Sequence, residues 1–247
     1  MIVRLIENQE ELDAVYRLTH DAYLEQGYIK PQPDGMFKNN ERYDRLPETD
    51  IFIAVDEDQI VGTVSMTRAN LTGFPYDRDF PEEVEKIKHC SIVMGRYLAA
   101  CWRIVTDSKC RHGLTVVLAL MQKIMEESAK YHVHEMIFEF NPKHVKFYNK
   151  MLGIQPVCEK VSKTVDAPGV LMYVDGRHLA CKWQDVCTKR RIEQTIFIKD
   201  FWWPTAKASP PSIWEYPQYA LSLTGCVFGF PLLWAVLLYD KMIPAKY

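Results

Sequence analysis

The chain lacks an excess of charge of either sign. Its 30 lysines and arginines nearly balance 32 aspartates and glutamates, giving a formal net charge of −2 at pH 7. No global positive field is therefore available to attract nucleic acid, and we expect no nucleic-acid partner. Of the 247 residues, 48% are apolar and 25% are charged, which is typical of a globular protein with a hydrophobic core.

Paired cysteines, a secretory leader and a zinc motif are also missing. The seven cysteines are odd in number and form no CxxC pair. The start of the chain, MIVRLIENQEELD, has no basic segment followed by an apolar one. His132 and His134 do not belong to an HExxH motif, so we predict no metal site. Together these absences predict a reduced, cytoplasmic protein.

Charge is absent altogether from one long stretch near the C-terminus. Residues 219–239, YALSLTGCVFGFPLLWAVLLY, are enough to span the hydrocarbon core of a bilayer. The segment that begins at residue 202 is rich in tryptophan and proline, and tryptophan favours membrane interfaces. Two interpretations are open: contact with the inner face of the cytoplasmic membrane through 202–239, or a buried helical hairpin. Either makes residues 186–247 an apolar C-terminal helical extension of a main domain at 1–185.

Strands and helices are predicted to alternate through the main domain. A long loop is expected at 28–50, where prolines are frequent. Hydrophobic periodicity and end signals predict, in order, a strand at 2–6, a helix at 8–27, a hairpin at 51–68, a helix at 80–89, a strand at 97–107, a helix at 114–132, a strand at 135–140, a helix at 142–152 and two or three strands within 156–183. This order predicts an α/β fold with one mixed sheet.

Five stretches of sequence follow one another in a familiar order. They are YRLTHDAYLEQGYI at 16–29, ERYDRLPETD at 41–50, VGTVSMTRANLTGFPYDRDFPEEVEKIK at 61–88, RYLAACWRIVTD at 96–107 and NPKHVKFYNKMLGIQPV at 141–157. In this order the chain resembles the N-acyl amino acid synthases of the GNAT fold, which are related to the acyl-homoserine-lactone (autoinducer) synthases of bacteria. The resemblance covers about residues 5–180. It implies a GNAT-type mixed central sheet flanked by helices.

The resemblance also implies an activity. Enzymes of this kind move a fatty acyl group from a thioester to an amine, here from acyl carrier protein to an amino acid. No tightly bound cofactor is expected, because the acyl-phosphopantetheine of the carrier, or acyl-CoA, is a co-substrate. Two alternatives stay open: an acyl-CoA-dependent N-acyltransferase that acts on another amine, and a non-catalytic module that binds acyl groups or the carrier.

Site residues follow from the resemblance position by position. The acceptor side is matched by Arg17, Tyr23, Tyr28, Glu41 and Asp44. The fourth-strand motif is matched at Arg103, the backbone N–H groups near Ile104 and Val105 would polarise the thioester carbonyl, and Tyr148 would protonate the leaving sulfur. The alternative for Tyr148 is packing of its ring on the sheet. The chain departs from the family at Ala100, where a glutamate is usual, and at Trp102, where serine is frequent.

Glu139 is our candidate for the missing base. In the strand EMIFEF at 135–140, alternation places Met136, Phe138 and Phe140 on one face and Glu139 on the other. Glu139 would then face the neighbouring strand that carries Arg103, and apolar surroundings would raise the pKa of its carboxyl group. The alternative is a structural ion pair of Glu139 with Arg103 or a lysine.

A binding region for the donor is predicted around two helix starts. The segment SKCRHGLT keeps a single glycine, Gly113, beside Arg111 and His112, a reduced phosphate cradle that suits the one phosphate of a phosphopantetheine arm. The second helix start supplies Asn141, Lys143 and His144. Nearby lysines would extend this region into a basic face for an acidic carrier protein, or they simply keep a helix face in solvent.

Overall fold

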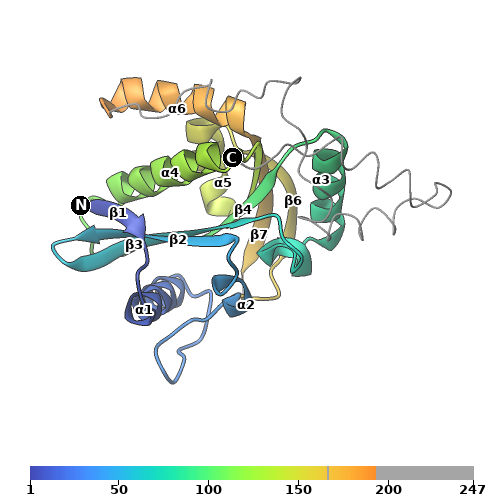
Figure 1. The fold of residues 1–247 in the computed structure, drawn as a ribbon. Helices are drawn as coiled ribbons and strands as arrows, with labels where there is room; N and C mark the ends of the chain where they lie inside the picture. The colour runs from blue at the N-terminus through green and yellow to red at the C-terminus, as the bar shows by residue number, and fades with distance from the viewer. Residues whose placement is uncertain (166, 193–247) are drawn as a thin grey trace.

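One mixed seven-stranded sheet forms the centre of the molecule (Figure 1). The computed structural model describes residues 1–165 and 167–192. The strands lie in the order β1-β2-β3-β4-β5-β7-β6. Their bounds are β1 Ile2–Leu5, β2 Thr49–Asp56, β3 Gln59–Arg68, β4 Leu98–Thr106, β5 Glu135–Phe140, β6 Gln155–Val161 and β7 Pro168–Asp175. Only β4 and β5 run parallel among the paired strands, so the predicted mixed sheet is confirmed.

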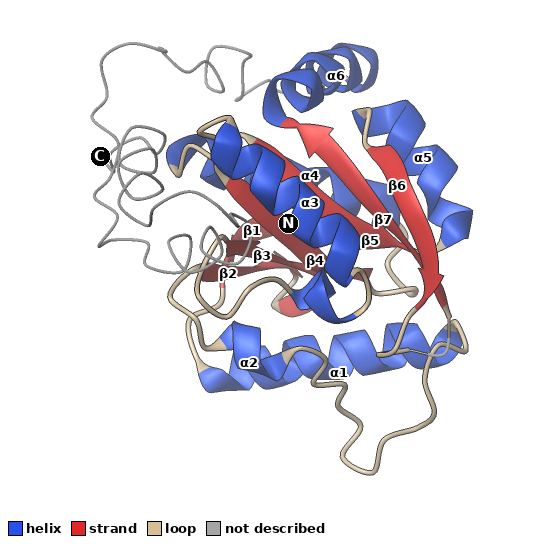
Figure 2. Cartoon of the chain, turned by 90° about the vertical axis from the view of Figure 1, so that its right-hand side faces the viewer, coloured by secondary structure: helices blue, strands red, loops and turns tan. Residues whose placement is uncertain are grey.

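Helices cover both faces of this sheet, as Figures 1 and 2 show. Their bounds are α1 Gln9–Glu25, α2 Glu41–Asp44, the 3₁₀ turn η1 Pro75–Arg78, α3 Pro81–Val93, α4 Gly113–Lys130, α5 Pro142–Leu152 and α6 Gly176–Arg190. Leu120 of α4, Leu152 of α5 and Trp183 of α6 are buried in one cluster with Phe138 of the sheet. On the opposite face α1, α2, η1 and α3 cover the sheet (Figure 2). The predicted flanking helices are confirmed.

Sequence signals at the helix ends explain why most boundaries agree with the predictions. Asn8 caps α1, because its side chain accepts a hydrogen bond from the Glu11 N–H at 3.0 Å. Asn141 caps α5 in the same way, and Pro142 occupies the first turn, where no N–H is needed. Gly153 ends α5 with a φ of 72°, a left-handed conformation that glycine adopts without strain.

The segment 156–183 holds two strands, within the two or three expected, and also the start of a helix that was not predicted. Only β6 and β7 are strands there, and the chain continues from Gly176 as the helix α6. The Asp175 side chain caps that helix by accepting from the Arg177 N–H at 2.9 Å. Buried Leu179, Ala180, Trp183 and later residues recur at helical rather than strand spacing. The boundary expected at residue 185 falls inside α6.

The predicted C-terminal extension lies mostly outside the described residues. Contact of 202–239 with a membrane and a helical hairpin at 219–239 therefore stay predictions. Within residues 1–165 and 167–192, every helix is too short or too polar to cross a bilayer.

The pairing of β4 with β5 ends before either strand does. Their parallel register runs from Leu98 opposite Glu135 to Cys101 opposite Phe138. Beyond this point β4 continues to Thr106 beside β3, while β5 continues to Phe140 beside β7. We call the place where the two strands separate the fork. It positions the site, because both strands present side chains to the space that opens there.

Candidate active site

A cavity of about 350 Å³ lies at the fork. Its lining comes from the end of α1, from η1, from the separated ends of β4 and β5, and from the segment that leads into β7. Eight of the residues predicted from the sequence line it: Tyr23, Tyr28, Arg103, Ile104, Val105, Glu139, Asn141 and His144. The fork therefore brings together the acceptor-side tyrosines, the two strand motifs and the start of α5.

Glu139 faces the cavity from the side of β5 that the alternation predicted. Met136, Phe138 and Phe140 pack into the core cluster on the other face. The pKa of the Glu139 carboxyl group is raised to about 7, mainly by burial and in part by the negative charge of Asp79, while Arg78 opposes the rise. A carboxyl group with this pKa exchanges protons readily at neutral pH, which is what a general base needs.

The alternative interpretation of Glu139 as half of an ion pair is wrong. Arg103 pairs instead with Asp44, whose two carboxylate oxygens both lie 2.8 Å from Nη2. Among the described residues, no lysine or arginine lies within ion-pair distance of the Glu139 carboxylate. Glu139 is therefore a buried carboxyl group that is left available for chemistry.

Residue 100, where the resemblance implies a glutamate, is an alanine in the β4–β5 ladder. Ala100 pairs with Ile137 in the β4–β5 ladder, and both side chains are buried in the cluster on the η1 side of the sheet. Glu139 follows Ile137 by two residues on the same face of β5. A carboxyl group thus reaches the fork from the neighbouring strand.

Gly169 of β7 makes room for the Glu139 carboxyl group. A Cβ atom placed on Gly169 would lie 2.0 Å from Glu139 Oε1 and 2.9 Å from its Cδ. Non-bonded atoms do not approach so closely, so a side chain here would push the carboxyl group away. No sequence signal identified this glycine, because its importance comes from a neighbour on another strand.

Gly169→Ala is expected to lower turnover by about tenfold or more, because small misplacements of a catalytic group are costly. The flexible end of Glu139 absorbs the clash, so the melting temperature should change little. A double-mutant cycle with Glu139→Gln provides the control. If the alanine acts by displacing Glu139, it has no further effect in the glutamine variant; equal losses in both backgrounds would contradict this.

A bulge in β4 turns Arg103 toward the same face as Glu139. The register against β3 shifts between Thr63 and Ser65, and Arg103 has a φ of 53°, a left-handed conformation that is strained for arginine. Trp102, the preceding residue, points to this face as well and lines the cavity. The Arg103 guanidinium packs 4.3 Å from the Trp102 ring and 5.3 Å from the Tyr16 ring.

Asp44 holds Arg103 in this position. The side chains of the pair are 0% and 1% exposed, and the Tyr16 hydroxyl donates a third bond to Asp44 at 2.8 Å. Burial raises the pKa of the Asp44 carboxyl group, and the neighbouring Arg103 charge opposes that rise. Asp44 does not itself line the cavity, so its predicted place on the acceptor side stays a prediction.

Aromatic residues from α1 form the opposite side of the cavity. The Tyr23 and Tyr28 rings meet edge to face at 5.8 Å. Burial and the nearby Glu139 raise the pKa of Tyr23 to about 12. The Tyr28 hydroxyl is buried without a hydrogen-bond partner among the described residues, and Lys143 lies 5.0 Å above its ring. Lys143 also donates a hydrogen bond to Gln26. This bond links the start of α5 to the end of α1 beside the cavity.

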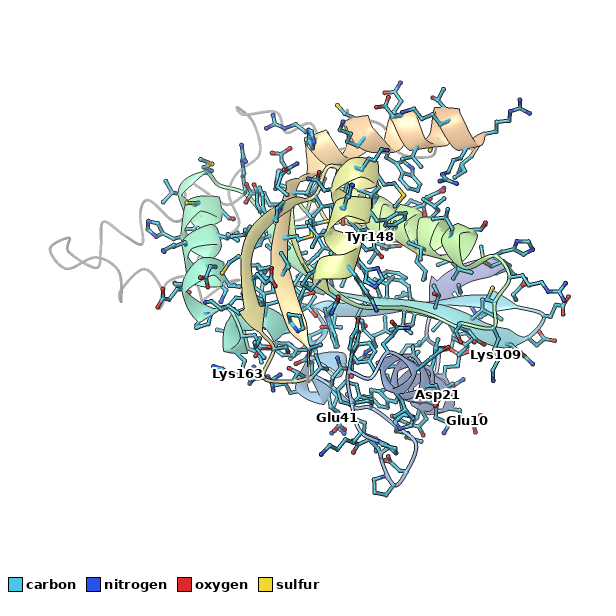
Figure 3. All side chains as sticks on the ribbon, turned by 180° about the vertical axis from the view of Figure 1, so that it is seen from behind. Glu10, Asp21, Glu41, Lys109, Tyr148 and Lys163 are labelled. Carbon is cyan, nitrogen blue, oxygen red and sulfur yellow. The ribbon has the colours of Figure 1, made fainter. Side chains whose placement is uncertain are left out.

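Tyr148 does not reach the cavity. Its ring stacks on Phe140 at 3.8 Å in the core cluster, and burial raises the pKa of its hydroxyl. Figure 3 shows it on α5, on the opposite side of the sheet from Glu41. Phe140 itself lines the cavity, so Tyr148 lies behind it. This position matches the alternative role of packing on the sheet, and its role as an acid stays a prediction.

The remaining predicted residues lie at the surface, away from the cavity. Arg17 is exposed on α1, where its neighbour Tyr16 faces Asp44 instead. Glu41 is paired with Arg45 on α2 at 2.9 Å. Arg111 and His112 are exposed, and His112 caps α4 without a side-chain hydrogen bond, ahead of Gly113. The start of α4 thus presents free backbone N–H groups, as a phosphate site requires.

Comparisons with known proteins agree with this geometry. A family model described as N-acyl amino acid synthase FeeM matches residues 14–175. No curated protein matches the chain by sequence. The structure of FeeM, an N-acyl amino acid synthase from uncultured soil microbes, is 21% identical with a TM-score of 0.62, and the match covers 72% of this chain and 93% of that chain.

Two acyl-homoserine lactone synthases are similar in fold. BjaI, a CoA-dependent enzyme whose structure contains MTA, is 16% identical with a TM-score of 0.52, covering 75% of this chain and 84% of its own. The synthase LasI is 13% identical with a TM-score of 0.51, covering 71% of this chain and 89% of its own. At these identities the similarity establishes a shared fold.

Proposed function

The chain belongs to the FeeM family of N-acyl amino acid synthases, and we propose that it transfers a fatty acyl group from acyl carrier protein to the amine of an amino acid. The product is an N-acyl amino acid. The observation on which this depends is the unpaired Glu139 carboxyl group, with a pKa near 7, in a cavity at the fork. Carboxyl groups with a shifted pKa are concentrated at catalytic sites, which favours an enzyme over a non-catalytic module.

The reaction would begin with Glu139 taking a proton from the ammonium group of the acceptor. The free amine then attacks the thioester carbon and a C–N bond forms, which leaves the nitrogen with one proton more than the amide product has. Glu139, after it has released the first proton to solvent, would take this second proton, and the C–S bond breaks. Backbone N–H groups near Ile104 and Val105, on the part of β4 that no longer pairs with β5, would stabilise the oxyanion. Arg103, fixed by Asp44, would maintain the shape of this strand around the cavity.

The departing thiolate also needs a proton. Two groups are candidates: Tyr148, which lies behind Phe140, and Glu139, which is protonated once it has deprotonated the amine. We propose Glu139, because it lines the cavity and Tyr148 does not. A single carboxyl group with a pKa near 7 can serve first as base and then as acid.

The choice of acyl carrier protein as donor is supported by an exposed basic surface near the cavity. Lys109 and Arg111 precede α4, and Lys146 and Lys150 lie on α5. Among the described residues, none of these four side chains has an ion-pair partner. Free positive charges of this kind attract an acidic carrier protein.

Acyl-CoA is the competing donor, and the relationship to the CoA-dependent enzyme BjaI favours it. Incubation of the purified protein with an amino-acid mixture and either acyl carrier protein or acyl-CoA, followed by mass spectrometry of the products, separates the possibilities. We expect N-acyl amino acids from the carrier donor. If products form only with acyl-CoA, then acyl-CoA is the donor. If neither donor releases a thiol, the protein does not catalyse the transfer.

The pH dependence of kcat/KM tests the role of Glu139. Only the ionised carboxylate accepts a proton, so kcat/KM is expected to rise with pH through about 7. Asp79→Asn removes a neighbouring negative charge that raises the pKa of Glu139, so this limb should move to lower pH. The substrate amine adds a separate limb at higher pH, which the variant leaves in place.

Asp77→Asn is the matched control for that experiment. Asp77 lies on η1, two residues before Asp79, but its carboxylate is 2.9 Å from Lys88, and its charge is not among the causes that shift the pKa of Glu139. The control should keep the profile of the natural protein. If the limb of the kcat/KM profile near pH 7 does not move in Asp79→Asn, a group other than Glu139 is responsible for it.

A further inference from the structure

Residues 162–165, which follow β6, form one wall of the cavity at the fork, and we call them the wall. Three of them, Ser162, Thr164 and Val165, line the cavity. Figure 3 labels Lys163, the fourth member. The wall lies where the hairpin of β6 and β7 turns, beyond the last pair of residues in that ladder. Its position over the cavity therefore depends on contacts outside the sheet.

Asp79, which directly follows η1, makes such contacts. Its carboxylate accepts hydrogen bonds from the Ser162 hydroxyl at 2.8 Å, the Lys163 backbone N–H at 3.2 Å and the Thr164 hydroxyl at 3.5 Å. The Asp79 side chain is only 3% exposed. Hydrogen bonds to an ionised carboxylate are stronger than those between neutral groups. One buried side chain thus fixes three consecutive residues of the wall.

Two more bonds organise the wall around this carboxylate. The Ser162 hydroxyl, which donates to Asp79, also accepts from the Thr164 N–H at 3.1 Å. The Lys163 ammonium group donates to the Arg78 carbonyl at 3.1 Å. These contacts join segments that lie more than 80 residues apart in the chain, which is why no sequence pattern identified Asp79.

A fixed wall matters because a thioester reacts with water as well as with an amine. Glu139, the base of the proposed reaction, would take a proton from water in the same way. In that side reaction a C–O bond forms, the C–S bond breaks, and the proton taken from water passes to the departing sulfur. The products are a fatty acid and the thiol. Exclusion of water from the cavity prevents this loss of the acyl group.

We propose that Asp79 is a positioning residue that directs the acyl group to the amine rather than to water, because its hydrogen bonds hold the wall in place between the cavity and solvent. The proposal rests on the proposed function, since it concerns the fate of the same thioester. It assigns Asp79 a role in selecting the acceptor.

Ser162→Ala tests this role with a small change. It removes the shortest bond from the wall to Asp79 and leaves the negative charge of Asp79 in place. We expect the ratio of fatty acid to N-acyl product to rise by about threefold or more, because a bond to a charged group is lost and the wall opens more often. Mass spectrometry of the products at a fixed amine concentration measures the ratio.

Two substitutions of Asp79 separate its hydrogen bonds from its charge. Asp79→Ala removes all three bonds to the wall, so the ratio of fatty acid to N-acyl product should rise further than in Ser162→Ala. Asp79→Asn loses the same charge but keeps one oxygen as an acceptor. It should therefore raise the ratio less than Asp79→Ala does. Equal ratios in these two variants would overturn the proposal, because the charge alone would then be responsible.

Ser91→Ala is a matched control. The Ser91 side chain is also buried and donates to a buried carboxylate, that of Glu135, at 2.5 Å, but Ser91 does not line the cavity. This variant should keep the product ratio of the natural protein. A ratio that stays unchanged in Ser162→Ala, or that rises equally in Ser91→Ala, would contradict the proposal.

Failure of this proposal differs from failure of the proposed function. If the natural protein acylates no amine, the proposed function fails and this proposal fails with it. If the natural protein acylates an amine and the product ratio is the same in Ser162→Ala and Asp79→Ala, only the role of Asp79 is wrong.

Hydrogen exchange measures the wall without substrate. The Lys163 amide donates to Asp79, so it should exchange faster in Asp79→Ala than in the natural protein and should be unchanged in Ser91→Ala. If Asp79→Ala does not fold, the Thr164 amide in Ser162→Ala gives the same information, because it donates to the Ser162 hydroxyl. Exchange that is no faster in the variants would show that these bonds do not hold the wall.

Discussion

Replacing Glu139 by glutamine is expected to lower turnover by about 10²-fold or more, because an amide cannot take a proton from the acceptor amine. Glutamine has nearly the same shape, so the cavity should keep its form. Burial disfavours the ionised carboxylate and raises its pKa, so a neutral amide should not lower the melting temperature. Steady-state kinetics with thermal unfolding of the same sample measure both effects.

Glu159→Gln is a suitable control for this experiment. Glu159 is an exposed glutamate on the edge strand β6 and does not line the cavity. Its replacement should leave turnover within about twofold, since substitutions at exposed positions away from the cavity have little effect. If Glu139→Gln also stays within threefold, Glu139 is not the base, and the proton must leave the amine by another route.

Local sequence patterns were sufficient where one segment determined its own structure. The cap at Asn8, the sequence Asn141-Pro142 and the left-handed Gly153 each specify a helix end through nearby atoms. The same holds for the orientation of Glu139, which follows from strand alternation over six residues. Helix α6 was not predicted. Its buried residues after Asp175 are separated by polar ones, so their helical spacing was not apparent in the sequence.

Features that depend on distant segments could not be predicted from the sequence. The partner of Arg103 lies 59 residues away at Asp44, and left-handed backbone at an arginine has no local signal. Gly169 comes close to the Glu139 carboxyl group only in the folded sheet. The family resemblance identified positions such as Arg17 and Glu41, but the fold leaves both at the surface.

The buried pair of Arg103 and Asp44 gives the largest expected effect on stability. Asp44→Asn removes the negative charge and leaves the guanidinium, whose side chain is 0% exposed, without a counter-charge. Breaking a buried pair in this way typically costs about 3–5 kcal/mol. For a domain of this size, that corresponds to a fall in melting temperature of about 10 °C. Turnover should fall as well, because Arg103 supports the bulged part of β4.

Glu41→Gln is the control on the same short helix. Its ion pair with Arg45 is exposed, at 46% and 79% for the two side chains, and a surface pair of this kind contributes little. We therefore expect no measurable change in the unfolding midpoint. A similar fall of the unfolding midpoint in both variants would mean that Asp44→Asn disrupts α2 rather than the buried charge pair.

Removing both charges tests the cause of the Asp44 effect. In Asp44→Leu combined with Arg103→Met, no charge remains buried between Tyr16 and Trp102, and two apolar side chains fill the space. Because the penalty in Asp44→Asn comes from an unpaired charge, the double variant should be more stable than Asp44→Asn alone. Denaturant unfolding of the two variants measures the difference. A double variant that is less stable would show that the hydrogen bonds to Asp44, including that from Tyr16, matter more than the balance of charge.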